Sequence, residues 1–142
     1  WWTPEDLVHF NAKADSVAAQ MSLYSYDGQQ NNGKLVEGEA IADQAGVGLA
    51  CEALKRSLKG HPPTKTRDGF TDVQRFFLGY ALCRANNQRP EAAHAQMTRD
   101  PHPLGMFRVN GPLSNEVNFY RAFDCKPGDK MVRPVDQRIN LW

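Results

Sequence analysis

The sequence predicts a mainly α-helical fold with at most a short hairpin. Apolar residues recur at three- and four-residue spacing in several segments, and a threonine stands at two helix starts. The stretch 24–34 is instead polar and rich in Gly, Asn and Gln. A chain of 142 residues buries about 68% of its unfolded surface, which is enough for one core. We therefore expect a single domain.

The first helix is predicted from Pro4 to about Met21. Thr3 is placed to cap it, Pro4 suits the first helical position, and Asp6 follows the cap by three residues. Apolar residues then recur along one face as far as Met21. These agreeing signals make this start one of the best-defined points of the sequence.

A polar loop and a second helix follow. Residues 24–34 predict a loop that holds a short strand or hairpin. The helix is expected over about 36–58, with its apolar residues on one side. Small residues such as Gly38 and Gly46 would let another backbone approach this helix closely.

A third helix is expected from Thr71, as its cap, to about Arg84. The preceding segment, 60–69, contains Pro62-Pro63 and mixed charges, and reads as a surface connection. The helix carries an aromatic face, and helical spacing of such residues indicates core packing. The face consists of Val73, Phe76, Phe77, Tyr80 and Ala81.

The last third of the chain predicts two short helices. One is expected over about 90–98, and Asp100-Pro101-His102-Pro103 ends it because proline biases the residue before it to extended conformations. The other is expected across 114–123, begun by Ser114. The tail beyond residue 126 is rich in turn-forming residues.

Composition limits the classes of function. The formal net charge is +1, so there is no electrostatic case for nucleic acid or an anionic membrane as partner. No apolar run approaches the ~18 residues that a membrane helix requires. The chain opens on Trp1 without an initiator Met, and we expect that the natural amino terminus lies upstream.

Glu39 and Asp43 form the most informative pair. They stand four residues apart in the second predicted helix and so share one face. Like charges at this spacing repel mildly, so the pair is best explained by a cation or by positively charged side chains between or beyond them. Glu39 could bind zinc through oxygen while Asp43 orients a ligating imidazole, although solvated surface carboxylates are the commoner case.

His102 and Arg108 are the second candidate pair. His102 lies between two prolines, and Arg108 follows six residues later. We interpret this segment as a stiff loop that presents both side chains. His102 would hydrogen-bond a developing oxyanion and Arg108 a carbonyl oxygen of a peptide. The sequence contains no H-E-x-x-H, P-loop or G-x-S-x-G motif.

Taken in order, these segments resemble the carboxy-terminal part of the neprilysin and endothelin-converting-enzyme family of zinc metallopeptidases. Trp1-Trp2-Thr3 resembles the family's D-W-W-T, residues 38–43 resemble G-E-N-I-A-D, and Phe76-Phe77 resembles paired aromatics of a later helix. Residues 100–115 are similar to D-x-H-S-P-G-x-F-R-x-x-G-x-L-x-N, and Trp142 ends the chain as in the family. The resemblance covers residues 1–142 and looks bacterial.

The resemblance implies a fold and four roles. The fold is the helical carboxy-terminal part of a thermolysin-like catalytic domain. Glu39 would be the third zinc ligand, Asp43 would hydrogen-bond a zinc-binding histidine, His102 would stabilise the oxyanion, and Arg108 would bind a carbonyl of the peptide. The cofactor would be zinc, the substrate a small peptide, and the location extracytoplasmic.

The same resemblance implies that two zinc histidines and the general base lie on an H-E-x-x-H helix that precedes Trp1. We therefore interpret the chain as a segment of an endopeptidase that is inactive alone and whose main partner is the amino-terminal part of the same polypeptide. Leu82-Cys83-Arg84 stands where the family usually has Gln-Val-Trp, lining the pocket for the residue after the scissile bond. Such departures leave open a free-standing, non-catalytic binding or structural module. A second chain could also supply the histidines.

Overall fold

The fold is mainly helical, as predicted. The computed structural model of the chain describes residues 2–60 and 66–141, so Trp1, Trp142 and the Pro62-Pro63 part of the expected surface connection lie outside the described residues. Helices α1 and α2 are separated by a two-stranded antiparallel hairpin, and the described residues that follow form four shorter helices and one 3₁₀ turn. The bounds are α1 Pro4–Met21, β1 Ser25–Tyr26, β2 Gln29–Gln30, α2 Glu37–Ser57, α3 Asp72–Arg84, α4 Pro90–Arg99, α5 Gly105–Leu113, α6 Val117–Ala122 and η1 Val135–Gln137.

Both predicted threonine caps are present. The Thr3 hydroxyl accepts the amide N–H of Asp6, and the Asp6 carboxylate accepts the Thr3 amide N–H in return. Thr71 and Gln74 make the same reciprocal pair at the start of α3. Each reciprocal pair, called a capping box, satisfies two backbone N–H groups that a helix start leaves unpaired. The sequence therefore located these two helix starts correctly.

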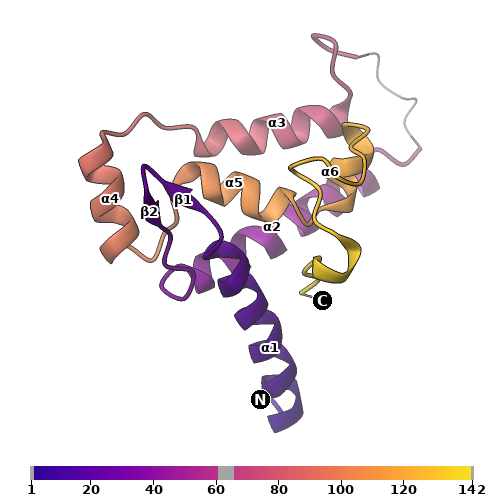
Figure 1. Cartoon of the computed structure of the whole chain (residues 1–142). Coiled ribbons are helices and arrows are strands. Elements are labelled where there is room, and N and C mark those ends of the chain that lie inside the picture. Colours follow the sequence, from indigo (N-terminus) through magenta and orange to yellow (C-terminus); the bar gives the residue numbers. More distant parts are fainter. Residues whose placement is uncertain (1, 61–65, 142) are drawn as a thin grey trace.

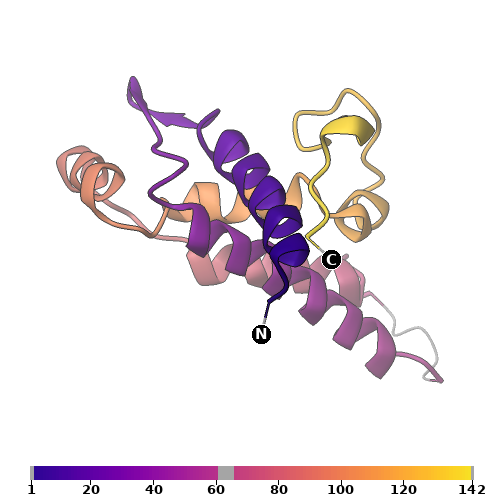
Figure 2. The same cartoon turned by 90° about the horizontal axis from the view of Figure 1, so that it is seen from below.

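Helix α5 lies at the centre of the fold and was not predicted. It packs against α2 on one side and α3 on the other, while α1 packs against α2. The N-terminal half of α1 projects away from the rest of the molecule (Figure 1), and the turned view shows α2 and α3 as neighbouring layers (Figure 2). Helix α5 thus contacts α1, α2 and α3.

Two clusters of buried side chains make up the core, and α2 and α5 contribute to both. The smaller cluster centres on Phe77, which is 1% exposed, with the other aromatic residues of α3 packed around it. The predicted aromatic core face is therefore confirmed. The larger cluster lies between α1, α2, α4, α5 and the tail, and consists of Val17, Met21, Val36, Ala40, Ala93, Met97, Leu104, Phe107, Ile139 and Leu141.

Three expectations about local structure are wrong. The segment after His102 is the helix α5, so Arg108 is a helical residue and the stiff loop ends at Leu104. The last helix begins at Val117, and Ser114 is the C-terminal cap of α5. A methyl group added at Gly38 or Gly46 would meet nothing within 4 Å in the described part of the chain, so neither glycine serves a close contact there.

Close approach instead requires Gly105. A methyl group built there would lie 2.3 Å from the carbonyl oxygen of Arg84, far inside contact distance. Only glycine therefore lets the start of α5 lie against the end of α3. Among the described residues, no helix has the length and hydrophobicity needed to span a bilayer.

Candidate functional site

Glu39 and Asp43 project from the same face of α2, as their spacing predicts, but into different surroundings. The Asp43 side chain is 4% exposed and the Glu39 side chain is 35% exposed. A buried carboxylate is costly unless it is paired and hydrogen-bonded. The positively charged side chains that the sequence called for are present and come from two other helices.

Arg108 supplies the main counter-charge from α5. Its Nε donates to Asp43 Oδ2 at 2.6 Å, and its Nη2 donates to Asp43 Oδ1 at 2.9 Å, which makes a two-point guanidinium–carboxylate pair. The same Nη2 donates to Glu39 Oε2 at 3.0 Å. Asp43 raises the pKa of Arg108 above its usual value, chiefly through this hydrogen bonding. Arg108 thus bridges both acids of α2.

Arg84, the last residue of α3, is a second guanidinium on Asp43. Its Nη2 donates to Asp43 Oδ1 at 2.9 Å. The Arg84 backbone is held beside α5 by the contact at Gly105, which sets the distance from which its side chain reaches α2. Composition and spacing did not predict this ion pair, because it joins residues 41 positions apart.

His102 completes the cluster from the segment before α5. Its Nε2 lies 3.5 Å from Glu39 Oε2, and its Nδ1 lies 2.7 Å from Asp100 Oδ1. The backbone N–H of His102 also donates to Asp100, and these two hydrogen bonds lower the pKa of Asp100. Asp100 orients the imidazole, and its position two residues before the histidine was a signal visible in the sequence.

The side chain of Gln96 in α4 fixes the loop that carries His102. Its Nε2 donates to the carbonyl oxygens of His102 and Pro103, at 3.0 and 3.2 Å. Pro103 and Leu104 are buried behind the exposed imidazole. The structure thus brings all four predicted residues, Glu39, Asp43, His102 and Arg108, into one cluster.

The donor set fits one position of a zinc site. Glu39 is a partly exposed carboxylate of the kind that ligates zinc, and the polar contacts given above all involve its Oε2. Within residues 2–60 and 66–141, however, no three His, Cys, Asp or Glu side chains are grouped closely enough to hold a metal ion. A zinc site that includes Glu39 therefore needs donors from outside the described residues.

Tyr80 connects α3 to the backbone of the site. Its hydroxyl donates to the carbonyl oxygen of Arg108 at 2.8 Å. Burial raises the pKa of Tyr80 from 10.0 to about 12, the negative charge of Asp43 adds to the shift, and Arg84 and Arg108 oppose it. Between pH 10 and 12 the unfolded chain releases this proton while the folded chain keeps it. The free energy of unfolding therefore falls as pH rises through this window.

Tyr80→Phe should remove much of that alkaline loss of stability. We expect the drop in unfolding free energy between pH 9.5 and 11.5 to shrink by roughly 1–2 kcal/mol, since partial exposure screens the full effect. Urea denaturation at both pH values measures it. Tyr26→Phe is the control, because the Tyr26 hydroxyl makes no hydrogen bond to the described residues. Equal pH slopes in the wild type and Tyr80→Phe would contradict the assignment.

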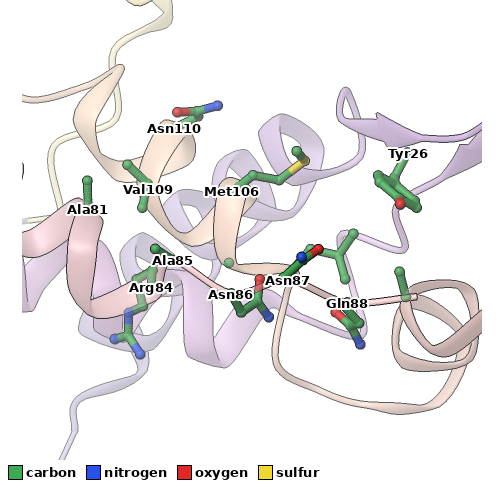
Figure 3. A pocket seen from close by; sticks show the side chains of 13 residues that line it. Tyr26, Ala81, Arg84, Ala85, Asn86, Asn87, Gln88, Met106, Val109 and Asn110 are labelled. Carbon is green, nitrogen blue, oxygen red and sulfur yellow. The ribbon is translucent and has the colours of Figure 1, made fainter. Parts of the chain in front are cut away.

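A cavity of about 380 Å³ lies beside α5 and the end of α3. Met106, Val109 and Asn110 line it, together with residues from the end of α3 and Tyr26 of the hairpin. The guanidinium of Arg84 points away from Met106 and Val109 (Figure 3). Arg84 also lines this cavity, whereas Arg108 is absent from its described lining, so the cavity adjoins the charged cluster at Arg84.

Comparison with known proteins identifies the family of this chain. A family profile described as Peptidase family M13 matches residues 1–139. Endothelin-converting enzyme 1 of Homo sapiens is 35% identical over 144 aligned residues, covering 100% of this chain. Neprilysin-3 of Drosophila melanogaster is also 35% identical over the full chain, and the neutral endopeptidase of Lactobacillus helveticus is 34% identical.

Solved structures give the same result. A zinc metalloprotease of Mycobacterium tuberculosis, crystallised with an inhibitor, superposes with a TM-score of 0.92 at 31% identity and matches 99% of this chain. PepO from Lactobacillus rhamnosis superposes with a TM-score of 0.81 at 36% identity. The chain spans about a fifth of these relatives: 18% of the human enzyme, 22% of the mycobacterial chain and 20% of PepO.

Proposed function

This chain belongs to peptidase family M13, a family of zinc metallopeptidases, and from that premise we propose that it forms the carboxy-terminal segment of a zinc-dependent endopeptidase acting on small peptides. The observation that carries the proposal is the convergence of Glu39, Asp43, His102 and Arg108, which come from two helices and one loop. An extracytoplasmic location is part of the same proposal, by resemblance to the family.

Glu39 is proposed as the one zinc ligand that this chain supplies. When bound, zinc supplies Lewis-acid chemistry that activates water toward the peptide carbonyl. The partial exposure of Glu39 suits a ligand that meets donors from another segment, and its contact with Arg108 fixes its orientation. The remaining donors and the general base would lie on an H-E-x-x-H helix, a motif that this sequence does not contain.

Asp43 is proposed to orient one of the zinc-binding histidines. A carboxylate oxygen accepts two hydrogen bonds. Oδ1 already accepts one from each guanidinium, whereas Oδ2 accepts one from Arg108 Nε among the described residues. Oδ2 therefore has the free lone pair that an imidazole N–H requires. Such an acceptor fixes the tautomer and ring orientation of a metal-ligating histidine.

His102 and Arg108 are proposed to contact the substrate. With Nδ1–H donated to Asp100, the Nε2 atom of His102 donates only when the ring carries both protons. In that form it would stabilise the negative charge that develops on the carbonyl oxygen. Arg108 uses Nε and Nη2 within the cluster, so its Nη1 is the atom that would donate to a peptide carbonyl.

Zinc titration and peptidase assays on two polypeptides test the proposal. One is this chain alone, and the other is this chain preceded by its natural upstream sequence. Because one carboxylate cannot hold zinc tightly, we expect the isolated chain to bind no stoichiometric zinc at micromolar concentration and to cleave no peptide. The longer polypeptide should bind one zinc and cleave small peptides, and a chelator should abolish that cleavage.

Two outcomes would overturn the proposal. One zinc held tightly by the isolated chain would show that the metal site lies within these residues. A longer polypeptide that neither binds zinc nor cleaves peptides would support the alternative of a non-catalytic binding or structural module on the same scaffold. Recovery of cleavage on mixing with a separate histidine-bearing chain would instead support assembly from two polypeptides.

A further inference from the structure

We propose that Arg84 makes this enzyme prefer peptides that carry a carboxylate within one residue of the carbonyl bound by Arg108. The proposal rests on the proposed function, which gives Arg108 its carbonyl ligand. It adds a specificity-determining residue and names the chemistry of the favoured substrate. The carboxylate can belong to an Asp or Glu side chain or to the free end of a peptide.

The first argument is proximity. Nη2 of Arg84 and Nη2 of Arg108 each lie 2.9 Å from the same atom, Asp43 Oδ1. Two donors that meet at one acceptor cannot be further apart than twice that length. This is less than the span of two residues in an extended peptide, ~6.6 Å. The two guanidinium groups are therefore neighbours, and we infer that a peptide carbonyl bound by Arg108 Nη1 brings the next residue of the peptide toward Arg84.

The second argument is unused hydrogen-bonding capacity. Arg84 Nε is buried and has no hydrogen-bond partner among the described residues. The side chain as a whole is 33% exposed, so part of it faces solvent, and its partial shielding strengthens charged hydrogen bonds. Guanidinium groups bind carboxylates through paired N–H donors. A substrate carboxylate is thus the complementary ligand.

The third argument is the local charge. In this chain the positive charges of Arg84 and Arg108 are balanced by the negative charges of two carboxylates, Asp43 and Glu39. Asp100 is engaged by His102 through two hydrogen bonds. In the proposed enzyme Glu39 is committed to zinc, which leaves two guanidinium groups on one buried carboxylate. The excess positive charge lies beside the substrate and favours an anionic group.

The activity arm of the test uses the longer polypeptide and one peptide scaffold. Glu, Gln or Leu is placed at each of the two positions flanking the scissile bond. The carboxyl terminus of the peptide is either free or amidated. We expect the best Glu peptide to exceed its Gln counterpart roughly tenfold in kcat/KM. Arg84→Gln should bring the Glu-to-Gln ratio of kcat/KM close to one, and Arg84→Lys should keep part of the preference.

The matched control is Arg89→Gln. Arg89 is exposed and lies in the segment that connects α3 to α4. This variant should leave the Glu-to-Gln ratio unchanged. A ratio near one in the wild type, or the same ratio in Arg84→Gln as in the wild type, would overturn the proposal. Dependence on a free peptide end, with no effect of Glu, would assign the carboxylate to the terminus.

A binding arm separates this proposal from the proposed function. Blocked dipeptides containing Glu or Gln are titrated into the 142-residue chain, and the side-chain N–H resonances of Arg84 are followed by NMR. The Glu dipeptide should shift them at lower concentration than the Gln dipeptide, and Arg84→Gln should remove the difference. If the longer polypeptide cleaves no peptide, the proposed function fails and this arm alone decides: equal shifts by the two dipeptides refute the role of Arg84.

Discussion

Arg108→Met should lower the free energy of unfolding of this chain by roughly 3–5 kcal/mol. The substitution keeps an apolar stem of similar length but removes two of the three N–H groups that Asp43 accepts. Asp43 is 4% exposed, so water cannot replace them. The charge that remains is buried with a single hydrogen bond from Arg84, and an incompletely paired buried carboxylate is strongly destabilising.

Urea denaturation at neutral pH measures this loss, with Arg75→Met as the matched control. Arg75 pairs with Asp68 at 3.2 Å, but both side chains are exposed, so that loss should stay below about 1 kcal/mol. The double variant Arg108→Met/Asp43→Asn should regain part of the lost stability, since it removes the unpaired charge. Equal destabilisation by Arg108→Met and Arg75→Met would show that the buried pair contributes no more than a surface pair.

Glu39→Gln should reduce peptidase activity of the longer polypeptide by more than about 100-fold. Loss of a residue that only orients a ligand typically costs 10–100-fold in metal affinity or activity, and Glu39 is proposed to bind the metal itself. An amide is neutral and a weaker donor to zinc than a carboxylate, so zinc content should fall in parallel with kcat/KM. Metal analysis and a peptide assay on the same preparation test both effects.

The control for Glu39→Gln is Glu52→Gln in the same helix. Glu52 pairs with Lys55 at 2.6 Å on the exposed surface and takes no part in the site, so this variant should retain zinc and activity. The loss of peptidase activity in Asp43→Asn should lie between the losses in these two variants, within the 10–100-fold range. Normal zinc content and activity in Glu39→Gln would remove Glu39 from the metal site.

The sequence predicted the elements whose signals are local. Thr3 and Thr71 marked two helix starts because a capping hydroxyl acts within one turn. The aromatic run of α3 indicated the core around Phe77 because its spacing is helical. Glu39 and Asp43 were found for the same reason, since a spacing of four places both on one face of α2.

Helix α5 was missed because its local signals are those of a loop. Its N-terminal cap Leu104 makes no side-chain hydrogen bond, and its sequence includes Gly105, Gly111 and Pro112. The spacing of Leu104, Phe107 and Gly111 was the signal available, because all three are buried and lie three and four residues apart. Tertiary packing between α2 and α3 therefore outweighs weak helix propensity here.

The ion pair between Arg84 and Asp43 could not be predicted from spacing. It depends on where α3 ends relative to α2, and that placement depends on the contact between Gly105 and the Arg84 carbonyl. Such long-range contacts become visible only once the helices are assembled. Residue types and spacing singled out the four cluster residues and the resemblance implied their roles, whereas the ion pair that joins Arg84 to the cluster is visible only in the structure.

The neutral amide of Gln96 has a further consequence for the segment that presents His102. Its hydrogen bonds to the carbonyls of His102 and Pro103 involve no formal charge. Dissolved ions weaken exposed charge pairs over a Debye length of about 8 Å at physiological ionic strength, but they do not screen amide–carbonyl bonds in this way. The backbone under the imidazole should hence keep its shape in concentrated salt, even where the surrounding charges are attenuated.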